Sequence, residues 1–145
     1  MIPSAGPLAD RCNVIEECYE FMLAYAAQGV SGADSGGLGG QIRTFLDRAA
    51  KALAGLAGAY SLVVDMLAME QGGLIPEAAY RAFLAVLDRD AKDSLAAVEL
   101  VLAQPVISSQ LIDNLNASVH LRALLTDLFL IDEIFKTQRD AKSAP

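Results

Sequence analysis

The sequence has no tryptophan, and aromatic residues make up only 6% of it. Because aromatic side chains are typical of strands, this shortage argues against a β-rich core. Basic residues are also scarce, with 11 Lys and Arg against 18 Asp and Glu and a formal charge of −7. Nucleic acid and anionic lipid are bound by clustered positive charge. We therefore expect neither a nucleic acid nor a membrane surface as a partner.

Long apolar segments and cysteines are also few. The longest uncharged apolar segment in the middle of the chain, residues 52–64, ends at Asp65 and is too short to cross a bilayer as a helix. Residues 1–13 lack a basic region followed by an apolar one, so no secretory signal is expected. Cys12 and Cys18 would lie roughly 9 Å apart along one helix, beyond the reach of a disulfide. Two unpaired thiols favour a cytoplasmic protein.

Apolar residues, which make up 54% of the chain, recur with the period of an α-helix. The spacing predicts a first helix over residues 8–28, a second from residue 41 to about 71, a third over 77–104 and a fourth from Ser108 or Ser109 to Arg139. Their inward positions are predicted to be Ile15, Cys18, Met22, Tyr25 and Ala26 in the first helix, a stripe from Ile42 to Leu67 in the second, one from Tyr80 to Leu102 in the third, and Leu121, Leu124, Leu125, Leu128, Ile131 and Phe135 in the fourth.

Glycine and proline mark the boundaries between these helices. Residues 29–40 are half glycine and predict a loop, and residues 72–76 and Pro105 predict two further breaks. Residues 1–7 and 140–145 are expected to be flexible tails. The small residues Ala54, Gly55, Gly58 and Ala59 in the second helix predict a close approach by another helix. Residues 1–145 thus form one all-α domain, expected to be an up-down antiparallel bundle of about four long helices.

Three segments carry more apolar residues than one helix face holds. They are Leu62 to Leu67, Leu100 to Ala103 and Leu128 to Ile131. Consecutive helical residues differ in direction by about 100°, so such runs point to more than one side. A second subunit is the commonest way to cover the surplus, and we therefore expect a homodimer. The alternative is that these helices are central in a larger monomeric core.

Residues 93–101, Asp-Ser-Leu-Ala-Ala-Val-Glu-Leu-Val, resemble the motif of acyl carrier proteins. In that family the serine carries a phosphopantetheine arm, and the acidic helix that follows it is recognised by partner enzymes. The resemblance implies that Ser94 is the attachment site and that Glu99 belongs to the recognition helix. Residues 116–119 are similar to the turn before the family's last helix. The other interpretation is that Ser94 is an ordinary polar position on the third helix.

No other pattern favours catalysis, a cofactor or a metal. The glycine-rich loop lacks the lysine of a nucleotide-binding P-loop. Glu16, Glu17 and Glu20 lack the Glu-x-x-His partner of a ferritin-type metal site, because Ala117 stands three residues before His120, the single histidine. A catalytic cysteine needs a basic partner, and His120 is the only histidine that could serve Cys12 or Cys18. Nothing in the sequence places it beside either cysteine. We expect no enzyme, no cofactor and no metal.

The leading hypothesis is a non-enzymatic helical protein–protein interaction module: a scaffold, a chaperone-like adaptor or an accessory factor. Such a module binds a partner segment in a groove between helices. One alternative is the carrier domain modified at Ser94. Another is a small-ligand-binding bundle whose pocket is lined by Tyr25, Tyr60 and Tyr80, although these tyrosines also suit a core whose hydroxyls reach its edge.

Overall fold

The computed structural model describes residues 6–32, 37–71 and 75–143, and this part of the chain contains helices and no strand. The helices are α1 (Pro7–Ala27), α2 (Leu38–Ala54), α3 (Leu56–Gln71), α4 (Glu77–Leu102), α5 (Ser109–Ala117) and α6 (His120–Ser143). The all-α prediction is confirmed, but the predicted number of about four helices is wrong. Two of the predicted helices are each divided into two shorter ones. The up-down bundle and the homodimer stay predictions.

The second predicted helix bends at Gly55, the residue between α2 and α3. The axes of these two helices differ in direction by 43°. Arg11 of α1 reaches across to this bend, and its Nη1 donates to the carbonyls of Lys51 and Ala52 at 3.0 and 3.2 Å. Carbonyls at a helix C-terminus have no partner within their own helix, so a guanidinium there is favourable. A Cβ on Gly55 would lie 2.4 Å from Arg11 Cζ. The small residues predict a close approach by another helix. At Gly55 the group that approaches is the side chain of Arg11 from α1.

The fourth predicted helix breaks after Ala117, at the segment that resembled a turn. Val119 adopts a φ of 64°, a left-handed conformation that a β-branched residue rarely takes. The hydroxyl of Ser118 donates back to the carbonyl of Leu115 and helps to end α5. At the other end of α5, Ser108 Oγ accepts from the backbone N–H of Leu111, as expected for a capping serine.

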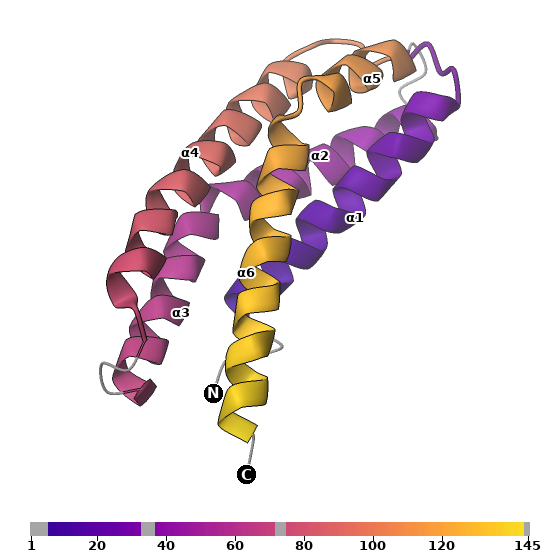
Figure 1. Cartoon of the computed structure of the whole chain (residues 1–145). Helices are drawn as coiled ribbons and strands as arrows, with labels where there is room; N and C mark the ends of the chain where they lie inside the picture. Colours follow the sequence, from indigo (N-terminus) through magenta and orange to yellow (C-terminus); the bar gives the residue numbers. More distant parts are fainter. Residues whose placement is uncertain (1–5, 33–36, 72–74, 144–145) are drawn as a thin grey trace.

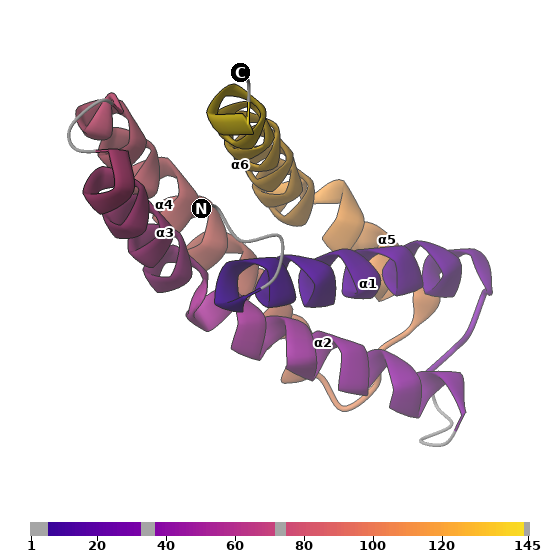
Figure 2. The ribbon, with the colours of Figure 1, turned by 90° about the horizontal axis from the view of Figure 1, so that it is seen from below.

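Figures 1 and 2 show the arrangement of the helices from two directions. In both views α1 lies beside α2, and α3 lies beside α4. The short α5 packs on α1, and α6 contacts α4 along part of its length. Figure 2 shows that the far end of α6 runs apart from the α3–α4 pair.

Most of the predicted inward positions form the core. Ile15, Cys18, Met22 and Tyr25 of α1 are buried, whereas Ala26 is only half-buried. The predicted stripe of α6 is buried throughout: Leu121, Leu124, Leu125, Leu128, Ile131 and Phe135. Helical periodicity therefore identified the faces of these helices correctly, although it did not place their ends.

A buried serine joins the end of α1 to the start of α5. Ser109 Oγ donates to the carbonyl of Tyr25 at 2.6 Å and accepts from the backbone N–H of Val30 at 2.8 Å. The Tyr25 hydroxyl in turn donates to the carbonyl of Ile107. Polar groups this deep in a protein are stable only when they are hydrogen-bonded, so these contacts fix the entry to α5.

The loop and tail boundaries differ slightly from the prediction. Helix α2 begins at Leu38, three residues before the predicted start, and α6 continues past Arg139 to Ser143. Residues 33–36 of the predicted loop, and residues 1–5 and 144–145 of the predicted tails, lie outside the described residues. Within the described ranges no single helix is long and apolar enough to span a membrane, while the bent α2–α3 pair passes that test by length and composition.

Substitutions at Arg11 and Gly55 test the bend. Arg11→Met removes the guanidinium, and we expect the free energy of unfolding to fall by about 1 kcal/mol because two hydrogen bonds to helix-end carbonyls are lost. Gly55→Ala should cost a similar amount, since the new methyl group displaces Arg11. In the Arg11→Met chain, however, Gly55→Ala should be neutral or stabilise by up to about 1 kcal/mol, because alanine favours a helix. Denaturant unfolding of the four chains measures this coupling, and strictly additive effects would contradict it.

Candidate functional site

An open cavity of about 370 Å³ lies where α6 separates from the α3–α4 pair. Its lining is entirely apolar or aromatic apart from two tyrosine hydroxyls. The residues that line it, here called the aromatic cavity, are Tyr60 of α3, Pro76 before α4, Ala79, Tyr80 and Phe83 of α4, and Leu130, Ile131, Ile134 and Phe135 of α6. Concave apolar sites of this size are the usual binding sites of proteins.

The aromatic rings of the cavity are held by contacts between the three helices. The ring of Tyr60 stacks on Phe135 of α6 with centroids 6.3 Å apart, and it meets the edge of Phe83 at 6.5 Å. The Tyr60 hydroxyl donates to the carbonyl of Tyr80 at 2.8 Å. Burial of this hydroxyl raises the pKa of Tyr60 to about 12. Tyr60 therefore supplies an apolar ring to the cavity, with its polar end engaged elsewhere.

Two carboxyl groups, one from α4 and one from α6, lie against each other beside the cavity. Burial raises the pKa of Asp127 to about 7, and a side-chain hydrogen bond with Asp90 and the charge of Asp90 contribute. Asp127 Oδ2 is buried and has no hydrogen-bond partner in the described part of the chain, which disfavours the charged carboxylate. Asp127 stands four residues before Ile131, one turn along α6 from the cavity.

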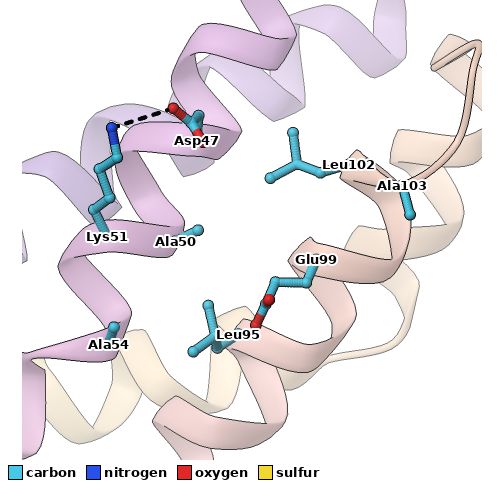
Figure 3. A pocket seen from close by; sticks show the side chains of 8 residues that line it. All are labelled: Asp47, Ala50, Lys51, Ala54, Leu95, Glu99, Leu102 and Ala103. Atoms are coloured by element: carbon cyan, nitrogen blue, oxygen red, sulfur yellow. Dashed lines mark ion pairs between the residues drawn. The ribbon is translucent and has the colours of Figure 1, made fainter.

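Ser94, the attachment site implied by the carrier resemblance, is fully buried on α4. Its hydroxyl lacks a hydrogen-bond partner among the described residues. Glu99 is exposed and lines a different, wide-open depression of about 460 Å³ between α2 and α4, where Figure 3 shows it near Leu95 and across from Ala50 and Ala54. A modifying enzyme reaches the Ser94 hydroxyl only if α4 separates from its neighbours. The structure therefore lends the carrier interpretation no support.

The other titratable candidates are dispersed. Burial raises the pKa of both Cys12 and Cys18 to about 12, and the charges of Glu16 and Asp132 contribute at Cys12, so both thiols stay protonated at neutral pH. His120 is exposed at the first residue of α6. Over residues 6–32, 37–71 and 75–143, no group of three or more His, Cys, Asp or Glu side chains is arranged to hold a metal ion.

Two of the three tyrosines proposed to line one pocket do meet. Tyr60 and Tyr80 both line the aromatic cavity, whereas Tyr25 lies elsewhere, bonded to the carbonyl of Ile107. The prediction of a shared pocket is thus wrong for Tyr25. No sequence pattern indicated the Asp90–Asp127 pair, since these residues are 37 positions apart and each resembles an ordinary charged position on a helix surface.

Comparison of this chain with protein-family models, curated proteins and solved structures found no match to any of them. The geometry of the chain is therefore the basis on which its function can be inferred.

Two buried serines provide a matched test of the Ser94 environment. Ser94→Ala removes a buried hydroxyl without a partner, and we expect the free energy of unfolding to rise by about 1 kcal/mol. Ser109→Ala removes a buried hydroxyl that makes two hydrogen bonds, and it should lower that free energy by about 2 kcal/mol. Urea unfolding measures both. Equal destabilisation by the two substitutions would show that Ser94 has a partner after all.

Proposed function

We propose that this protein is a non-enzymatic interaction module that binds a segment of a partner polypeptide, with an apolar anchor of that segment in the aromatic cavity. The observation that supports this most directly is the open, apolar lining of the cavity between α3, α4 and α6. A polar substrate finds few partners in such a lining, whereas an apolar side chain gains about 25 cal/mol for each Å² removed from water. Scaffold, adaptor and accessory roles all fit this activity.

Charge indicates the flanks of the partner segment. The chain has a formal charge of −7, and Asp90 and Asp127 lie one to two turns from the cavity along α4 and α6. A Lys or Arg that follows the apolar anchor would lie close to these two carboxyls. We therefore propose an amphipathic partner helix with an apolar face and basic flanks. Opposite charges of this kind favour association and register.

The proposed module is a cytoplasmic homodimer. Large apolar side chains remain exposed in each of the three runs that exceeded one helix face, among them Leu62, Leu100 and Leu130. A second copy is the partner we expect to cover part of this surface. Two free cysteines on α1 are in keeping with a reducing compartment.

A small apolar ligand is the second candidate occupant, because the cavity volume of about 370 Å³ falls within the range of small-molecule sites. Such a ligand has no need of the carboxyl pair. Its binding should therefore be independent of Asp127, which separates it from a basic partner segment.

Neighbouring residues on α6 give a matched test of partner binding. Leu130 is 51% exposed and lines the aromatic cavity, whereas Phe129 is 57% exposed and faces α1. The probe is a fluorescein-labelled helical peptide of Leu, Ala and Lys, long enough for about four turns. We expect Leu130→Glu to weaken its binding at least about tenfold, since a carboxylate then replaces an apolar contact. Phe129→Glu adds the same charge and should leave the affinity within about twofold. Fluorescence anisotropy measures both, and equal effects would overturn the proposal.

The same peptide tests the role of the carboxyl pair. Its cation binds the deprotonated pair, and the pKa of Asp127 is raised to about 7, so the affinity of the native protein should rise between about pH 5.5 and pH 8. Asp127→Asn replaces the titrating carboxyl with an uncharged amide of the same size and should remove this dependence. A pH dependence that persists unchanged in Asp127→Asn would exclude the pair as the cation site.

A further inference from the structure

The aromatic cavity and the Asp90–Asp127 pair lie along the same faces of α4 and α6. On α4, Asp90 stands seven residues after Phe83, which lines the cavity. On α6, Asp127 stands seven residues before Ile134, which also lines it. Seven residues make about two helical turns, so each carboxyl is nearly in line with its cavity residue. Because α4 and α6 run in opposite directions (Figure 1), both carboxyls stand at the same end of the cavity.

The two ends of the cavity differ in charge. At the end where α4 begins, Asp65 and Glu77 share the guanidinium of Arg81, and each accepts a hydrogen bond from it at 2.7 Å. At the other end, Asp127 Oδ2 is buried without a hydrogen-bond partner among the described residues, and the charge of Asp90 beside it has the same sign. A positive group supplied by a partner is therefore more favourable at the Asp90–Asp127 end.

The volume of the cavity fits two apolar side chains. An engineered cavity of about 150 Å³ holds one benzene ring, whereas the aromatic cavity measures about 370 Å³. Two side chains three or four residues apart lie on one face of a helix, about 5–6 Å from each other. A helix can therefore place both in the cavity. A third position on the same face, about two turns further on, then reaches the level of the two carboxyls.

The direction of such a helix follows from its dipole and from its neighbours. Lys and Arg are favoured in the last turn of a helix, where the dipole is negative. The C-terminus of the partner helix then lies toward Asp127 and its N-terminus toward Phe135, so this helix runs opposite to α6. Figure 1 shows that α3 and α6 run in the same direction. Because neighbouring helices in up-down bundles alternate in direction, an added helix antiparallel to both fits that alternation.

We propose that the partner segment is a helix that runs antiparallel to α6, with two apolar residues three or four positions apart in the aromatic cavity and a Lys or Arg in its last turn beside Asp90 and Asp127. This inference rests on the proposed function, to which it adds the direction and the sequence pattern of the partner. The reverse direction would place the same cation at the end of the cavity where Arg81 already bonds both carboxylates.

Two end-capped, fluorescein-labelled peptides of identical composition test the direction. Each is an alanine-rich helix of about four turns with two leucines four residues apart, and its lysines stand in the last turn of one peptide and in the first turn of the other. At pH 8, where Asp127 is deprotonated, we expect the first peptide to bind at least about fivefold more tightly, as measured by fluorescence anisotropy. Asp127→Asn should abolish this preference. Asp132→Asn removes a carboxyl of α6 that acts on Cys12 and Glu16 of α1, and it should retain the preference.

A nitroxide at either end of the first peptide reports the direction independently of affinity. In nuclear magnetic resonance spectra of the labelled protein, the N-terminal nitroxide should broaden the amide signal of Phe135, and the C-terminal one that of Leu124. The opposite pattern, or a preference that persists in Asp127→Asn, would overturn the direction and leave the proposed function standing. Failure of both peptides to bind would overturn the proposed function as well. Dissociation of a preformed dimer by the peptide would show that a second copy occupies the cavity, which would also contradict the proposal.

Discussion

The bend between α2 and α3 at Gly55, where the Arg11 guanidinium bonds the end of α2, is the constraint on which the rest of the structure depends. The hydrogen bonds join α1 to carbonyls 40 and 41 residues further along the chain, at the glycine where the helix direction changes by 43°. This change sends α3 away from the line of α2 and allows it to pair with α4. The Tyr60 hydroxyl then reaches the Tyr80 carbonyl, and the Tyr60 ring reaches Phe135 of α6. The aromatic cavity and the outer face of α3 both follow from that bend.

The apolar residues that exceed one helix face divide into a buried set and an exposed set. In each of the three apolar runs some residues are buried and their neighbours are exposed: Val63 beside Leu62, Val101 beside Leu100, and Ile131 beside Leu130. The buried members hold the chain together, because burying such a side chain stabilises a fold by about 1.5–3 kcal/mol. Of the exposed members, Leu130 lines the aromatic cavity that we propose as a binding site. One sequence property thus supports both the fold and its proposed activity.

The sequence predicted the helices and their inward faces, because helical periodicity is a local property that each segment displays by itself. The prediction missed the break at Gly55, because a single glycine is tolerated within a helix. Arg11, which stabilises the bend, is also distant in the sequence. The prediction also failed at Val119, where no glycine marked the turn. The aromatic cavity and the Asp90–Asp127 pair depend on the angle and register between helices. Periodicity within one helix carries no information on either.

The bend at Gly55 and its contact with Arg11 can be measured in solution. Nuclear Overhauser spectroscopy of the isotope-labelled protein shows whether the Arg11 guanidinium protons lie close to the Gly55 Hα protons. We expect cross-peaks between these groups and an interruption of the helical contacts at Gly55. An unbroken series of helical contacts from residue 51 to residue 59, with no cross-peak to Arg11, would contradict the proposed role of the bend.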